Sequence, residues 1–402
     1  MKLFSMIRAA VGVAGLGLVS SGAVAGGLTG PSCTAPLRAL FAQDNIYELE
    51  ASGSTIFALT SQDGVLAIDV SDPLNPVELD RYPLRPEFME LDGDLLYGLN
   101  RPTGLPATVV ILDVSDPSDI TLVAEHPVVG TADPIPAAFL GMDINDSIGY
   151  FTFIANSVNG IGSGFSVVDL SDPMNPVHIG HRFFRGTDEY FGMASSVGFG
   201  SHAYVYGFHP TIGQGIHIFD HSDPALPAVG FVPNGSFRLN IHDSMLFVNG
   251  VSAQVYDLVD PAAPSLISEF PNVGSSTSVS FFGDDAFVNT SNDGIRRYDF
   301  SDPANPQFLI AYETFDRVSD SVTDGSVIYG ANFVSGLEVA LIDDCELECS
   351  ADLNSDGAVN FLDISSFLIL FVDQDLIVDL NDDGSLNFMD VTLFLDAYGV
   401  GC

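Results

Sequence analysis

The stretch VLAIDVSDPLNPVELDRY (residues 65–82) contains the pattern that decides the fold. An apolar run rich in β-branched residues ends at Asp69, an Asp-Pro turn follows, and a second run begins after Pro76. Proline fixes φ in such a turn, and short Asp and Ser side chains can bind its backbone amides. The stretch therefore predicts two antiparallel strands joined by a tight turn.

The phrase Asp-x-Ser/Val-Asp-Pro recurs along the chain. It begins at Asp69, Asp113, Asp169, Asp220, Asp257 and Asp299, at intervals of 44, 56, 51, 37 and 42 residues. Each copy ends a strand-like run, such as VVILD or IHIFD, and two further strand-like segments precede that run. Four short antiparallel strands per repeat are typical of a β-propeller blade. The acidic turns could instead bind metal, but their uniform form in every blade favours a structural turn.

The last repeat is incomplete and indicates how the ring closes. Residues 319–343 supply three strands without an Asp-Pro turn, whereas the segment from Pro36 aligns with the outer strand that follows Pro76. The N-terminal strand is therefore predicted to complete the last blade, which leaves no open edge there. The predicted fold is mainly β, a seven-bladed β-propeller over residues 36–343, followed by a small α-helical calcium-loop domain.

The IDVSDPxxP phrase resembles the LVIVD repeats of secreted bacterial propellers. The copy at Asp257 departs from that pattern because Val259 replaces the serine. The resemblance implies the propeller fold and assigns no particular activity.

Two acidic stretches near the C-terminus repeat each other: ADLNSDGAVNFLDISSFL (residues 351–368) and VDLNDDGSLNFMDVTLFL (residues 378–395). Each places Asp, Asn, Asp, Asn and Asp at positions 1, 3, 5, 9 and 12 of a loop, with Gly at position 6. This is the spacing of a twelve-residue calcium loop, in which position 7 contributes its backbone carbonyl. The predicted ligands of two Ca²⁺ ions are Asp352, Asn354, Asp356, Ala358, Asn360 and Asp363, and Asp379, Asn381, Asp383, Ser385, Asn387 and Asp390.

A helix is predicted after each loop. Ile364, Phe367, Leu368 and Phe371 have the i, i+3, i+4, i+7 spacing of one apolar helix face. Val391, Phe394, Leu395 and Tyr398 repeat that spacing.

Two loop–helix units in about fifty residues resemble a type I dockerin, and the Gly401-Cys402 ending resembles the GC-type dockerins on secreted proteins of planctomycete-like bacteria. The resemblance covers residues 349–402, after a short linker at 344–348, and implies a cohesin-like protein partner. In dockerins, loop positions 10 and 11 contact the partner. Here they are Phe361-Leu362 and Phe388-Met389, which either form an apolar docking surface or are buried.

Charge and the N-terminal segment define the expected setting. The chain has 53 acidic residues against 12 Lys and Arg, a formal net charge of −41, which disfavours nucleic acids and anionic membranes as partners. Residues 1–25 have the basic, apolar and small-residue order of a secretory signal. No later segment is long and apolar enough to span a membrane. A secreted or cell-surface location is predicted.

The cysteines fit an oxidising location. Cys33, Cys345, Cys349 and Cys402 permit three pairings. We favour Cys33–Cys345 and Cys349–Cys402, because each bridge would then join the ends of one predicted domain.

No catalytic motif is present, so catalytic residues stay unassigned and an enzymatic role is left open. Long loops in blades 2 to 4, together with the segment at 183–192, indicate a candidate ligand face on the propeller. It consists of Arg101, Phe184, Arg185, Asp188, Glu189, Tyr190 and His209. The predicted function is that of a binding protein anchored by its dockerin, and the resemblance to dockerins implies a setting of polysaccharide breakdown. The alternative is a hydrolase or lyase with its site in the propeller channel.

Overall fold

The computed structural model divides the chain into two compact units, Met1–Ala340 and Leu341–Cys402. It describes residues 32–33, 38–40, 45–61, 64–84, 86–100, 108–128, 135–157, 160–185, 191–233, 238–250, 252–271, 273, 276–290, 294–312, 318–332, 336–342, 351, 353, 359–372, 374, 376–378, 380 and 385–400.

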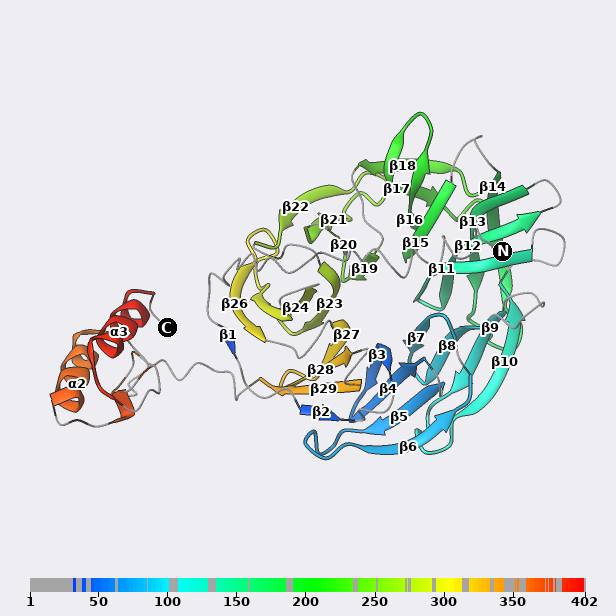
Figure 1. Cartoon of the computed structure of the whole chain (residues 1–402). Coiled ribbons are helices and arrows are strands. Elements are labelled where there is room, and N and C mark those ends of the chain that lie inside the picture. Colours follow the sequence, from blue (N-terminus) through cyan, green and yellow to red (C-terminus); the bar gives the residue numbers. More distant parts are fainter. Residues whose placement is uncertain are drawn as a thin grey trace. The chain divides into compact units, whose positions relative to one another are not determined.

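The first unit is a seven-bladed β-propeller (Figure 1). Blade 1 contains β3 (Ile46–Ser52), β4 (Thr55–Thr60), β5 (Val65–Asp69) and β6 (Val77–Tyr82). Blade 2 contains β7 (Met89–Asp92), β8 (Leu95–Asn100), β9 (Thr108–Asp113) and β10 (Thr121–Pro127). Blade 3 contains β11 (Ile135–Asn145), β12 (Ile148–Ser157), β13 (Gly160–Asp169) and β14 (Val177–Arg185). Blade 4 contains β15 (Phe191–Phe199), β16 (His202–His209), β17 (Gly213–Asp220) and β18 (Ala228–Pro233).

The remaining blades complete the ring. Blade 5 contains β19 (Arg238–His242), β20 (Met245–Asn249), β21 (Gln254–Asp257) and β22 (Ser265–Glu269). Blade 6 contains β23 (Ser276–Phe282), β24 (Asp285–Thr290), β25 (Ile295–Asp299) and β26 (Gln307–Tyr312), and blade 7 contains β27 (Val318–Thr323), β28 (Val327–Asn332) and β29 (Gly336–Leu341).

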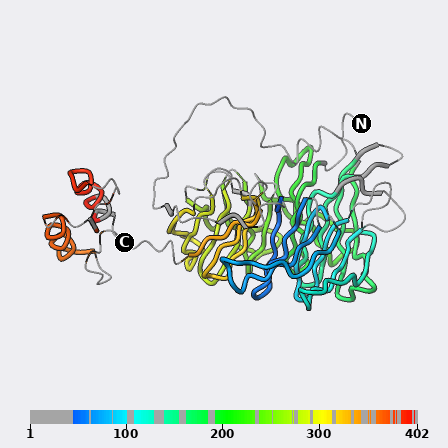
Figure 2. Tube along the Cα trace, turned by 60° about the horizontal axis from the view of Figure 1, so that its bottom comes forward, coloured from blue at the N-terminus to red at the C-terminus, as the bar shows by residue number. Residues whose placement is uncertain are grey.

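The N-terminal segment supplies the outer strand of blade 7. β2 (Arg38–Leu40) pairs antiparallel with β29, with Ala39 opposite Glu338. This confirms the predicted closure, and the first and last blades are neighbours in the ring (Figure 2). A second N-terminal strand was not predicted: β1 (Ser32–Cys33) pairs in parallel with β26 and extends blade 6.

Burial varies systematically across each blade. In blade 1 the whole of β4 is buried, β5 is buried up to Asp69, and the outer strand β6 is partly exposed. The middle strands are covered by neighbouring blades on both sides, so they read as continuous apolar runs rather than as alternating ones. Large aromatic side chains such as Phe57, Phe153 and Phe247 fill the space between blades.

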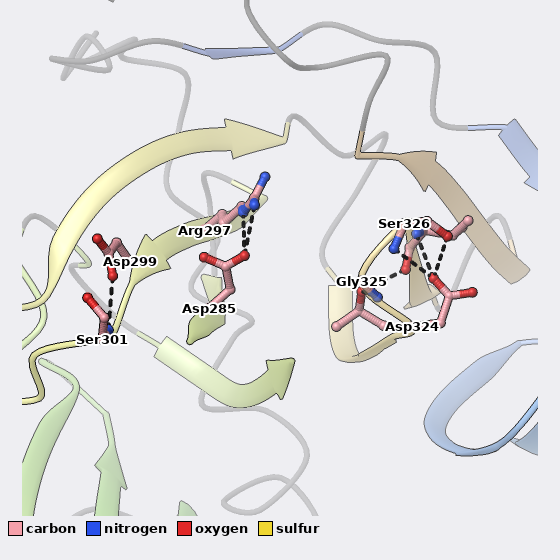
Figure 3. Close-up of polar contacts among 9 residues, drawn as sticks. Asp285, Arg297, Asp299, Ser301, Asp324, Gly325 and Ser326 are labelled. Carbon is pink, nitrogen blue, oxygen red and sulfur yellow. Dashed lines mark hydrogen bonds and ion pairs between the residues drawn. The ribbon is translucent and has the colours of Figure 1, made fainter. Parts of the chain in front are cut away.

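The Asp-Pro turns have one geometry in all blades that carry the motif. The first Asp of each copy accepts a hydrogen bond from the amide two residues later, at 2.8–2.9 Å. The second Asp does the same at 2.9–3.1 Å. Figure 3 shows the contact between Asp299 and Ser301. These carboxylates stabilise their own turns, which confirms the structural interpretation of the motif.

Blade 7 has a different turn, in keeping with its lack of the motif. Asp324 accepts bonds from the amides of Ser326 and Val327, at 2.9 and 2.8 Å (Figure 3).

In blades 1, 3 and 5, the outer strand is hydrogen-bonded to the turn of the next blade. Ser268 in β22 donates to the carbonyl of Pro303 at 2.6 Å, and Arg182 in β14 donates to the carbonyl of Leu226 at 3.1 Å. Asp80 in β6 accepts from the amide of Ile120 at 2.8 Å. The Asp-Pro turns therefore connect the blades as well as the strands within them.

The second unit contains two short helices, α2 (Phe361–Val372) and α3 (Phe388–Val400), with a 3₁₀ turn, η2 (Leu376–Val378), between them. Phe367 and Phe394 stack at the centre of this unit, with ring centroids 4.2 Å apart. Among the described residues, none of the helices is long and apolar enough to cross a membrane.

The predicted helix faces are correct except at one position in each repeat. Ile364, Phe367 and Phe371 contribute to the small core, as do their counterparts in α3. Leu368 and Leu395 are instead 56% and 54% exposed. Each helix packs through a narrow stripe because the unit is small, so its i+4 residue faces solvent.

Candidate functional site

The first strand of every blade lines the centre of the propeller (Figure 1). These strands contribute carboxylates on one side of the ring: Glu48 and Glu50 on β3, Glu90 on β7, Asp143 on β11 and Asp320 on β27. On the other side, β15 and β23 contribute serines and β19 contributes Arg238. The lining is therefore acidic along blades 7, 1, 2 and 3 and neutral or basic along blades 4, 5 and 6.

The channel carboxyls are held in unusual electrostatic surroundings. Burial, helped by the charge of Asp320, raises the pKa of Glu48 to about 8. Burial raises the pKa of Asp143 to about 7, although the amide of Gly198 acts in the opposite direction. Each of these side chains keeps some contact with solvent in the channel, but the surrounding protein removes most of its hydration.

The sequence alone did not indicate this group of carboxylates in the channel. Acidic residues are so abundant in the chain that no single one stands out. One signal was available: Glu48 and Glu50 alternate within a strand, so their side chains lie on one face of the first strand of a blade.

The candidate ligand face on blades 2 to 4 is only partly covered by the described residues. Arg101, Asp188, Glu189 and Tyr190 lie outside them, as does the side chain of Arg185. Phe184 is a correction: its side chain is only 6% exposed, with Arg182 placed over its ring at 5.0 Å. It belongs to the core between blades because it alternates inward along β14.

His209 is partly exposed at the end of β16, as expected for that face. Its Nδ1 accepts hydrogen bonds from the amides of Thr211 and Ile212, both at 3.2 Å. The imidazole therefore stabilises its own loop, and Nδ1 is engaged in that turn.

The predicted calcium loops end in two buried carboxylates. Asp363 and Asp390, at position 12 of each loop, are both 0% exposed. Asp363 accepts from the amide of Asn360 at 2.8 Å, and Asp390 accepts from the amide of Asn387 at 2.7 Å. The two Asn side chains in turn accept amides at the start of α2 and α3, so each loop closes with a capping box.

The other loop ligands are less completely described. Ser385 is described and exposed in the second loop. The remaining predicted ligands lie outside the described residues: Asp352, Asn354, Asp356, Ala358, Asp379, Asn381 and Asp383. Within the described parts of the chain, no three acidic, histidine or cysteine side chains are grouped to hold a metal ion.

The surroundings of the two buried carboxylates, Asp363 and Asp390, show whether a bound cation would fit there. The unit Leu341–Cys402 contains no Lys, Arg or His. A buried carboxylate is costly unless a cation or a full set of hydrogen bonds compensates its charge. Asp363 and Asp390 have no cationic side chain in their own unit to do so. Oxygen ligands around a hard divalent cation are the arrangement that fits this donor set.

The two apolar pairs at the helix starts are exposed rather than buried. Phe361 and Phe388 are 72% and 81% exposed, and Leu362 and Met389 are 57% and 55% exposed. The phenylalanines six residues further along each helix, Phe367 and Phe394, are buried. The exposure of the two pairs therefore depends on their place at the helix start. Large exposed apolar surfaces on a small soluble unit commonly mark a site of protein interaction.

The predicted disulfide pairs cannot be followed, because Cys345, Cys349 and Cys402 lie outside the described residues. Cys33 lies in β1, opposite Tyr312 of β26.

Comparison with known proteins identifies one repeat family. The LVIVD repeat model matches residues 107–126, which include β9, the Asp-Pro turn of blade 2 and most of β10. No curated protein matches the chain significantly.

Two solved structures are similar to this chain. The computationally designed Ika8 protein is 10% identical, with a TM-score of 0.46, covering 74% of this chain and 96% of that one. Sqt1 of Saccharomyces cerevisiae is 8% identical, with a TM-score of 0.49, covering 78% of this chain and 99% of that one.

Proposed function

We propose that this protein is a secreted β-propeller that is attached to a partner protein through a calcium-dependent, dockerin-like C-terminal unit. The observation that carries the proposal is the buried pair Asp363 and Asp390, both 0% exposed in a unit without a cationic side chain. Two Ca²⁺ ions would supply the missing positive charge and fix both loops. The ions would be held by the loop residues at positions 1, 3, 5, 7, 9 and 12.

The exposed pairs Phe361-Leu362 and Phe388-Met389 support a docking role. They occupy equivalent places at the first turn of α2 and α3, beside the predicted loops. Loop folding would therefore set the position of both pairs, which makes docking dependent on calcium. A cohesin-like module at the cell surface or in a polysaccharide-degrading assembly is the proposed partner. Its binding face would have to be apolar, with a neutral or basic rim facing this acidic unit.

Partner capture tests this role. Full-length protein is used to capture proteins from the envelope of the producing organism, with calcium or with excess chelator. Replacing all four residues of the two pairs with Ala is expected to reduce capture more than tenfold, because buried aromatic anchors dominate such interfaces. The matched control replaces Val77, Leu122, Val177 and Leu266, which are 58%, 52%, 61% and 52% exposed on the propeller, with Ala.

Two outcomes of that comparison would count against the proposal. Capture that survives in chelator would remove the calcium dependence. Equal losses in the test variant and the propeller control would show that general surface hydrophobicity, rather than the two pairs, is responsible.

The second candidate function is that of a hydrolase or lyase acting in the channel. The raised pKa values of Glu48 and Asp143 favour it, because a carboxyl that stays protonated near neutral pH can act as a general acid. Turnover of neutral or acidic polysaccharides by the protein, lost in Glu48→Gln, would support this candidate. Saturable binding without turnover would support the role as a binding protein.

A further inference from the structure

Carboxylates join the first strands of successive blades around the channel. Asp320 of blade 7 accepts the amide of Leu49 in blade 1 at 3.1 Å. Glu48 of blade 1 accepts the amide of Met89 in blade 2 at 2.7 Å. The same arrangement follows between blades 2 and 3, where Glu87 accepts from Phe139 at 3.2 Å, and between blades 3 and 4, where Asp143 accepts from Gly198 at 3.0 Å. We call these four contacts, which run from blade 7 to blade 4, the channel seam.

The channel seam includes the place where the ring closes. β27 of blade 7 and β3 of blade 1 are in contact, although they are far apart in sequence. A further hydrogen bond there links the hydroxyl of Ser319 to the carbonyl of Tyr47 at 2.9 Å. Blade 7 itself is completed by only three residues of the N-terminal segment, Arg38–Leu40. Weakening the seam would therefore weaken the contact between blades 7 and 1, where the ring is closed by noncovalent contacts.

The charges that face the channel seam are strongly unbalanced. Glu50 of β3 and Glu90 of β7 add two carboxyls to those of Glu48, Asp143 and Asp320. Arg238 of β19 reaches across the ring, where its Nη1 donates to the carbonyl of Ser319 at 3.2 Å. The other first strands add few titratable groups. Strands β15 and β23 contain none. β19 also carries His242, which lies beside Asp243, and β7 ends at Asp92. Among the described residues, a single guanidinium therefore faces these five carboxyls, in addition to that of Glu87 in the seam.

Five carboxyls in a narrow channel cannot all be ionised at low cost. The pKa values of Glu50 and Glu90 are raised well above the ordinary value. Burial is the main cause, and repulsion by the neighbouring carboxylates is the second. Burial also raises the pKa of Asp320, partly offset by the amide of Leu49 and by Arg238. A protonated carboxyl can still accept an amide through its carbonyl oxygen. Proton binding thus removes repulsion without removing the contacts between blades.

We propose that the channel seam is a proton-dependent clasp, in which bound protons hold the first strands of blades 7, 1, 2, 3 and 4 together and their loss loosens the ring. This inference does not depend on the docking function. The folded state binds more protons than the unfolded chain between about 4.5, the ordinary value for Glu, and about 8, the value for Glu48. Stability from the seam is therefore present below that window and is lost as the pH rises through it.

Calorimetry of the full-length, calcium-saturated protein tests the clasp. The midpoint of the propeller transition is expected to fall by on the order of 5 °C between pH 5 and pH 8. The double variant Glu50→Gln/Glu90→Gln should lose at least half of that pH dependence. The control Asp94→Asn/Asp284→Asn removes the same charge from two exposed turns and should keep the wild-type dependence.

Hydrogen exchange gives a local readout that general charge repulsion would not produce. After correction for the intrinsic effect of pH, protection at Leu49, Met89 and Gly198 should fall between pH 5 and pH 8. Protection at Leu246 in blade 5 should change less. Equal pH dependence in the wild type and the Glu50/Glu90 variant, or uniform loss of protection around the ring, would overturn the proposal.

Discussion

Chelation of calcium is expected to unfold the dockerin-like region, residues 349–402, while the propeller stays folded. The core of this region is small: among its described residues, the fully buried apolar side chains are Ala351, Phe367, Val378 and Phe394. Such a core barely offsets the entropy of ordering the chain. Ion binding should therefore supply most of the folding free energy, about 4 kcal/mol at a calcium concentration 1,000-fold above Kd.

The measurement is circular dichroism together with calorimetry, in calcium and in excess chelator. Helical signal and one thermal transition should disappear in chelator, and the propeller transition should remain. Asp363→Asn/Asp390→Asn provides the sharper comparison, because Asn keeps the size of the side chain and one oxygen that can accept the capping amide, but removes the charge. If these carboxyls served only as caps, the variant would remain helical without calcium. If they are ligands, it should need at least tenfold more calcium to fold.

Gly230→Ala is expected to destabilise the propeller by roughly 3 kcal/mol, at the upper end of overpacking effects. A Cβ atom at Gly230 in β18 would lie 2.0 Å from the carbonyl oxygen of Ala262, in the Asp-Pro turn of blade 5. That turn cannot shift freely, since the amide of Ala262 is bound to Asp260 at 3.1 Å. Urea unfolding, followed by the β signal, gives the loss directly.

Gly207→Ala is the matched control for that variant. Gly207 lies in β16 of the same blade, and the nearest atom to its added Cβ would be Cγ of Met193 at 3.2 Å. A flexible methionine can move away, so the expected cost is below about 1 kcal/mol. Similar losses in both variants would show that the contact between blade 4 and the turn of blade 5 is not rigid.

The propeller could be predicted because its main signals are local and repeated. Asp69 and its counterparts end strands and bind their own turns, so sequence spacing translates directly into blades. Ring closure could also be predicted, since the segment after Pro36 aligns with the outer strand of blade 1. β1 could not, because Ser32 and Cys33 carry no pattern and their pairing with β26 depends on the finished ring.

The sites were harder to predict because they depend on which way a side chain points. Glu48, Glu90 and Asp320 come together only when distant first strands meet at the channel. Leu368 matches a helix face in sequence, but the short helix buries a narrower stripe. For Phe361 the sequence favoured burial over docking, and this was wrong, because the packed unit leaves its side chain exposed.

Calcium binding by the full-length protein is the most direct test of the central claim. The protein is stripped of metal and titrated with Ca²⁺ while bound calcium and helical signal are recorded together, with Asp363→Asn/Asp390→Asn as the reference. At a calcium concentration that just saturates the wild type, we predict that it binds two more ions per chain than the variant and that helical signal rises in proportion to them. Equal calcium uptake by the two proteins, or full helical signal before any ion binds, would contradict the account.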